Sequence, residues 1–175
     1  GFDLVDRMDR RAFLASGLFL ALAACGTTSE PQVGSDGKPL PRVYKIKDPR
    51  EVSFRFLDSM NTLRSAKGLP PVAFDAALNA AAETHSRDMS VQNRPWHFGS
   101  DGSSPLVRAQ RAGFNGRLMG ENISETYETE LETLSSWMAM PDTRVVIMDP
   151  MATRLGFAWF QEPSGKIWWT MVTGA

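Results

Sequence analysis

The chain has 175 residues, of which 42% are hydrophobic and 10% aromatic, and its formal net charge is −1. This composition is typical of a globular domain and excludes an intrinsically disordered chain. The 19 basic residues nearly balance the 20 acidic ones and form no basic block, so nucleic-acid binding is not expected. Cys25 is the only cysteine, so the folded domain has no internal disulfide.

An export signal is predicted near the N-terminus. Residues 10–24, RRAFLASGLFLALAA, place a basic pair before an apolar run of about a dozen residues, which is too short to span a membrane. The pair Arg10-Arg11 and the residues after it resemble the twin-arginine export signature. Residues 22–26, LAACG, resemble the box at which bacterial lipoproteins are cleaved before a cysteine that carries lipid.

These patterns predict three segments. Residues 1–24 are the signal peptide, residues 25–47 are the lipidated Cys25 with a flexible tether, and residues 48–175 are the folded domain. The expected localisation is the cell envelope, with the exported protein anchored through lipid on Cys25 to a membrane, facing the periplasm or lying at the outer membrane. The alternative is an unlipidated signal with an incidental cysteine.

The domain is predicted to begin with helices. In chain order they cover residues 48–67, 75–91, 104–113 and 129–141. The first opens with a capping box, in which Asp48 caps the helix and Glu51 returns a bond to it. In the second, one apolar stripe is made of Leu78, Ala82, His85 and Met89.

The C-terminal end has a different pattern. Residues 155–160 and 167–172 are rich in aromatic and aliphatic side chains, and residues 162–166, EPSGK, supply a turn between them. We therefore expect a β-hairpin. Helices followed by an antiparallel hairpin predict an α+β fold built of packed layers.

Few residues carry chemistry. The sequence has no GxSxG elbow, no HExxH zinc helix and no GxxxxGK[ST] phosphate loop. His97 lies in a glycine-rich segment, and Glu121 lies between Gly120 and Asn122; both are expected in loops. If the fold brings His97 and Glu121 together, they form a small polar site for a divalent cation or polar ligand. The alternative is that each makes only structural hydrogen bonds.

The second histidine is expected to have a structural role. His85 lies on the apolar stripe of the second helix. A buried imidazole needs a hydrogen-bond partner, so we expect His85 to bond to backbone and to tie its helix to a loop.

Four segments together resemble the CAP superfamily of cysteine-rich secretory proteins, antigen 5 and pathogenesis-related 1 proteins, also called SCP domains. The segments are residues 81–89 (AAETHSRDM), 97–114 (HFGSDGSSPLVRAQRAGF), 120–124 (GENIS) and 137–160 (WMAMPDTRVVIMDPMATRLGFAWF). The resemblance covers residues 50–173 and is strongest to small bacterial members. It implies an α-β-α sandwich with a central antiparallel sheet, and a cleft that in many members holds two histidines and two glutamates.

The resemblance also implies which cleft groups are present. His97 matches the first cleft histidine, and Glu121 matches the glutamate of the GEN motif. Thr143 stands where the second histidine is expected, and the second glutamate has no clear counterpart near Trp137. Threonine is a poor metal ligand, so we predict no cofactor and only weak zinc binding by His97 and Glu121.

Three functions remain open. The favoured one is a non-catalytic binding module whose cleft takes a small ligand, peptide, glycan or envelope protein. The expected cleft residues are His97, Glu121, Asn122 and Thr143. The second is a hydrolase, such as a peptidase, with His97 as base and Glu121 as its partner. The third is a structural envelope protein. Catalysis is less favoured because two cleft groups are missing.

Overall fold

The computed structural model describes residues 33–39 and 43–175. The predicted signal peptide and Cys25 lie outside the described residues. Residues 33–39 form a short turn that is closed by a bridge between Val33 and Pro39. Residues 43–175 belong to a separate folded unit, which contains every helix and strand named below.

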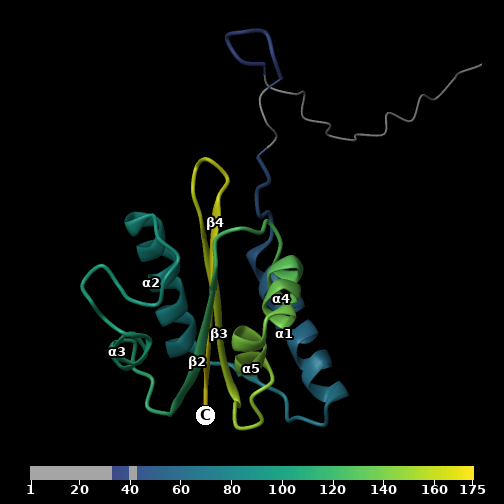
Figure 1. The fold of residues 1–175 in the computed structure, drawn as a ribbon, viewed down its shortest axis with the longest axis vertical. Coiled ribbons are helices and arrows are strands. Elements are labelled where there is room, and N and C mark those ends of the chain that lie inside the picture. The colour runs from purple at the N-terminus through teal and green to yellow at the C-terminus, as the bar shows by residue number, and fades with distance from the viewer. Residues whose placement is uncertain (1–32, 40–42) are drawn as a thin grey trace, which may run out of the picture. The chain divides into compact units, whose positions relative to one another are not determined.

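Five helices and four strands make up residues 43–175 (Figure 1). The helices are α1 (Pro49–Ala66), α2 (Ala76–Gln92), α3 (Pro105–Arg111), α4 (Glu130–Ala139) and α5 (Pro141–Ile147). The strands are β1 (Ala73–Phe74), β2 (Leu118–Ser124), β3 (Arg154–Gln161) and β4 (Ile167–Gly174). The predicted helices and hairpin are confirmed to within a few residues.

The strands form one sheet in the order β1-β3-β4-β2. β4 lies between β3 and β2 and is antiparallel to both, whereas the two-residue β1 runs parallel to β3. Helices α2 and α3 lie on one side of the sheet, and α1, α4 and α5 lie on the other (Figure 1). This α-β-α sandwich confirms the expected fold class.

An aromatic stack joins α1 to the sheet. The rings of Phe56 and Phe157 are parallel with centroids 3.7 Å apart, and Phe157 also stacks on Trp169 at 5.7 Å. All three side chains are buried. Large aromatic rings remove much apolar area from water, so this stack is a main source of stability for the α1 side.

The other side of the sheet packs unusually closely against α2. A Cβ atom on Gly156 would lie 2.3 Å from the backbone carbonyl of Leu78, so only glycine allows this approach. The side-chain oxygen of Asn79 accepts a hydrogen bond from the Phe157 N–H at 2.9 Å. These contacts fix α2, and with it His85, against the sheet.

Two sequence expectations about elements are wrong. Glu121 lies in strand β2 and not in a loop. Gly120 and Asn122 favour strands poorly, so the strand depends on pairing with β4 rather than on local preference. Pro141 does not simply end a helix, because it also occupies the first position of α5, where its missing N–H costs nothing.

The expected capping box at α1 is only half formed. The Asp48 carboxylate accepts hydrogen bonds from the N–H groups of Arg50 and Glu51 at 3.0 and 3.2 Å. The Glu51 carboxylate turns away and accepts from Arg55 at 2.7 Å. The folded part also begins slightly before residue 48, because Gln161 donates a side-chain hydrogen bond to the backbone carbonyl of Tyr44.

A buried arginine links the end of α1 to the segment that follows α5. Arg64 is 0% exposed and lies near the end of α1. Its guanidinium donates to four backbone carbonyls at 2.7–3.0 Å, those of Pro70, Ile147, Asp149 and Ala152. It therefore fastens the chain after α5 to the end of α1.

We expect Arg64→Met to lower the free energy of unfolding by about 3 kcal/mol or more, because four carbonyls lose their donor. Chemical denaturation measures this loss. Arg87→Met is the matched control: Arg87 is 60% exposed in an ion pair with Glu83 and should change stability by about 1 kcal/mol at most. Equal effects of the two substitutions would contradict the role assigned to Arg64.

Candidate functional site

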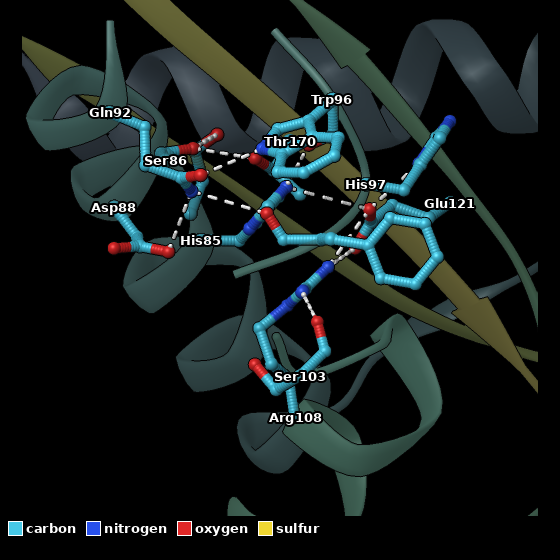
Figure 2. A network of polar contacts seen from close by, with 12 residues as sticks. His85, Ser86, Asp88, Gln92, Trp96, His97, Ser103, Arg108, Glu121 and Thr170 are labelled. Atoms are coloured by element: carbon cyan, nitrogen blue, oxygen red, sulfur yellow. Dashed lines mark hydrogen bonds and ion pairs between the residues drawn. The ribbon is translucent and has the colours of Figure 1, made fainter. Parts of the chain in front are cut away.

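Glu121 is the centre of a buried polar network. It is paired with Val172 of β4, and its side chain is only 3% exposed. Three side chains from separate elements converge on its carboxylate: Arg108 of α3, His97 of the loop after α2, and His85 of α2 (Figure 2). Residues distant in sequence thus meet at one point of β2.

Arg108 makes the strongest contact with this carboxylate. One guanidinium nitrogen of Arg108 lies 3.0 and 2.8 Å from the two Glu121 oxygens, and another donates to the carbonyl of Ser103 at 3.1 Å. The Arg108 side chain is 5% exposed. Because both charges are buried, each neutralises the other, and loss of either would leave an unpaired buried charge.

His97 is the exposed member of the network. Its Nδ1 lies 2.9 Å from Oε1 of Glu121, and the side chain is 50% exposed. An ionised carboxylate only accepts hydrogen bonds, so Nδ1 carries the hydrogen and donates it. In the neutral ring Nε2 then keeps its lone pair, on the half-exposed side chain.

The loop that carries His97 is fastened to α2 on both sides of the histidine. Gln92, the last residue of α2, accepts from the indole N–H of Trp96 at 2.8 Å and donates to the carbonyl of Phe98 at 3.1 Å. Asn93 follows in the left-handed conformation, with φ 51°, and turns the chain away from the helix. These bonds place the ring before any ligand arrives.

His85 has the structural role that the sequence predicts. Its Nε2 lies 2.7 Å from the carbonyl oxygen of Trp96, so it ties α2 to the His97 loop. The same nitrogen is 3.7 Å from Oε1 of Glu121. Burial lowers the pKa of His85, although the Glu121 carboxylate acts in the opposite direction. We conclude that the imidazole is neutral at physiological pH and donates to the carbonyl.

Asn122 and Thr143 belong to a different set of contacts. The Asn122 amide donates to the backbone carbonyl of Thr143 at 2.9 Å. The Thr143 hydroxyl donates to the carbonyl of Trp137 at 2.7 Å. The four residues expected in one cleft are therefore divided: His97 and Glu121 form the polar network, whereas Asn122 and Thr143 link β2 to the α4–α5 turn.

Arg108 was missed in the sequence. It lies in a short helix whose other charged residue, Arg111, is exposed, and nothing in the local pattern distinguishes the two. Arg108 could have been identified only if the glutamate of the GEN motif were known to pair with an arginine earlier in the chain. A single sequence does not contain that information.

A polar cavity lies behind Arg108. It has a volume of about 420 Å³ and is lined by α2, the loop of residues 100–103 and α3. Its lining includes Asp88, Asp101, Arg108 and Arg111. This cavity therefore reaches the network through Arg108 and offers charged groups beside alanine side chains.

Comparison with known proteins agrees with this architecture. Residues 57–173 match the model of the CAP family, described as the cysteine-rich secretory protein family. The chain belongs to this family. It is 29% identical over 114 residues to an uncharacterised protein, YkwD, of Bacillus subtilis, a match that covers 65% of this chain and 44% of YkwD. The chain thus spans less than half of that relative.

Solved structures of low sequence identity share the fold. An outer surface protein of Borrelia burgdorferi superposes with a TM-score of 0.67 at 14% identity, covering 76% of this chain and 98% of that one. An extracellular SCP-domain protein of Bacillus anthracis superposes with a TM-score of 0.63 at 22% identity, covering 75% and 45% of the two chains. Within the described residues, no helix is long and apolar enough to cross a membrane.

The residues present do not fit the metal site of fuller family members. Among the described residues, no group of three or more His, Cys, Asp or Glu side chains is placed to hold a metal. Arg108 already occupies both oxygens of Glu121, which leaves Nε2 of His97 as a single ligand. Zinc sites in proteins use at least three protein ligands.

We therefore predict that zinc binds weakly or without defined stoichiometry. Isothermal titration of the wild type and of His97→Ala tests this prediction. The two proteins should give similar, weak heats. Submicromolar one-to-one binding that disappears in His97→Ala would refute it.

The ion pair itself predicts a large coupling energy. Glu121→Gln should lower the free energy of unfolding by about 3–5 kcal/mol, because Arg108 keeps its charge without a counterion. The double variant Arg108→Gln/Glu121→Gln should lose less than the sum of the two single variants. Arg111→Gln, which breaks the exposed pair with Asp101, is the control and should change stability little. Additive losses in denaturation would show that the pair is not coupled.

Proposed function

We propose that this chain is an exported CAP domain, held to the cell envelope through lipid on Cys25, that acts as a non-catalytic binding module. The observation that carries the proposal is the state of His97: its Nδ1 is held by a buried carboxylate, and its ring is half exposed. A ring fixed in this way offers one hydrogen-bond acceptor, Nε2, to a ligand at the surface.

The role of Glu121 supports binding more than catalysis. A general base is a group that is free to accept a proton and has a pKa near the working pH. It can be an unpaired carboxylate, or a histidine whose basicity is raised by a neighbouring carboxylate. Glu121 is buried and shares both oxygens with Arg108. Its contact with His97 therefore serves to orient the ring.

The hydrolase alternative rests on the same His97–Glu121 bond. A nucleophilic mechanism also needs a hydroxyl or thiol within hydrogen-bond reach of the base. In the part of the chain that the structure describes, Glu121 is the one side chain hydrogen-bonded to His97. A hydrolase would therefore have to use water directly, and this makes it the second candidate.

Two kinds of observation support the proposed location in the cell envelope. The sequence has a segment typical of an export signal and a cysteine in a lipoprotein-like box. Two structural neighbours are described as an outer surface protein and as an extracellular protein. Replacing Cys25 by Ser should move the protein from the membrane fraction to the soluble fraction, if lipid on this residue is the anchor.

The binding role is tested with three probes: a mixture of linear peptides, soluble peptidoglycan fragments and short-chain phospholipid. We expect one class to shift the His97 ring resonances in NMR and to raise the melting temperature, with no product detected by mass spectrometry. His97→Ala should bind that class at least tenfold more weakly and keep its free energy of unfolding within about 0.5 kcal/mol.

Two results would overturn the proposal. Product that forms with wild type and is absent with His97→Ala would make the protein a hydrolase. If no probe class moves the His97 resonances or raises the melting temperature, the structural role takes first place.

A further inference from the structure

The register of the sheet shows which backbone groups of β2 face outward. Phe157 donates its N–H to Asn79, away from β4, so its partner Met171 turns its own backbone groups toward β2. Met171 pairs with Asn122, which therefore bonds to β4. By alternation, the N–H and C=O groups of Glu121 and Ile123 point to the outer edge of the sheet.

This edge is partly closed at both ends. A register shift between Leu118 and Gly120 interrupts the regular strand at its start. At the other end, the indole N–H of Trp137 donates to the carbonyl of Ile123 at 3.0 Å. Between these points, three edge groups have no partner among the described residues: the N–H and C=O of Glu121 and the N–H of Ile123.

The backbone of Glu121 is partly accessible to solvent. Glu121 as a whole residue is 9% exposed, whereas its side chain is 3% exposed, so most of its exposed area is backbone. The opposite edge of the sheet differs. There Asn79 closes the N–H of Phe157, β1 covers the start of β3, and Phe157 is 1% exposed. The start of that edge is therefore covered by β1 and Asn79, whereas the middle of β2 keeps unpaired backbone groups.

We propose that this edge of β2 binds an extended segment of a partner protein as an added antiparallel or parallel strand. The inference rests on the binding function proposed above and names its ligand class, a linear peptide. Extended peptides commonly bind to free sheet edges, where backbone hydrogen bonds give affinity and alternate side chains give specificity. The three free groups have the donor and acceptor order that such a strand requires.

The surroundings of β2 suit a peptide. Both α3 and α5 contact β2, from opposite sides of the sheet. Exposed apolar side chains occur on the segments flanking the strand: Phe98, Leu106 and Val107 on one side, Met140 and Val145 on the other. Successive side chains of an added strand point to opposite faces, so they would extend alternately toward the α3 side and the α5 side. His97, held by the same Glu121, lies beside this path.

The charge of the site favours recognition of backbone over recognition of a charged group. Arg108 and Glu121 neutralise each other inside the protein. In its neutral form the His97 ring adds a single acceptor, Nε2, which can take a hydrogen bond from a peptide N–H or side-chain hydroxyl. Three backbone bonds and one imidazole bond predict a short epitope of moderate affinity.

A matched pair of substitutions at Ile123 tests the proposal. Ile123→Pro removes one free edge N–H and places the ring in the path of an added strand, while the ladder to β4 loses no bond. Ile123→Ala removes the side chain but keeps the N–H. The probe is a phage library of random linear twelve-residue peptides, selected on the wild-type domain, with the selected peptide then synthesised.

The expected result is binding of the selected peptide to wild type and Ile123→Ala, and at least tenfold weaker binding to Ile123→Pro. Peptide should also slow hydrogen exchange of the Glu121 and Ile123 amides in wild type. Peptides methylated on alternate backbone nitrogens should lose binding in one register and keep it in the other. These wild-type measurements stand even if Ile123→Pro fails to fold.

Several outcomes would overturn the strand model. They are failure to select any linear peptide, equal binding by Ile123→Pro and Ile123→Ala, and unchanged exchange at Glu121 and Ile123. If glycan or lipid shifts the His97 resonances without protecting these amides, the binding function stands and the peptide inference fails. If peptide protects the amides and His97→Ala binds it equally well, strand addition stands and the role given to His97 fails.

Discussion

The buried ion pair between Arg108 and Glu121 is the constraint on which the site depends. Two charges can be removed from water only if each satisfies the other, and here both glutamate oxygens contact one guanidinium at 2.8 and 3.0 Å. The pair fastens α3 to β2. It also holds the carboxylate in the one position from which it can accept from His97, so the orientation of the exposed ring follows from a contact made beneath it.

The residues expected in one cleft have separate roles in the structure. Thr143 does not replace a histidine chemically, because its hydroxyl bonds to the backbone of Trp137. It works with Asn122 to hold the α4–α5 turn against β2. The remaining His97 and Glu121 are stabilised from the other side by Arg108 and His85. The network therefore holds the His97 ring in one fixed orientation.

Glu121 joins two features that would otherwise be independent. Its side chain anchors His97, and its backbone lies at the open edge of the sheet. A partner that hydrogen-bonds along β2 would contact the ring and the strand together. A substitution at this residue would therefore disturb the ion pair, the ring and the edge at once.

Much of the fold could be predicted from the sequence, because periodicity and caps are local. The stripe of α2 and the aromatic hairpin follow from residue spacing, and the structural role of His85 follows from its place on that stripe. Strand β2 was missed because Gly120 and Asn122 favour no strand, and its formation depends on β4, which follows some fifty residues later in the chain. Arg108 was missed because burial and pairing are properties of the tertiary structure. The sequence thus determined the helices, the hairpin and the family motifs. Tertiary packing decided which charges form an ion pair, which histidine ring is exposed and which backbone groups of β2 stay unpaired. These features depend on contacts between residues far apart in the chain, so local patterns do not reveal them.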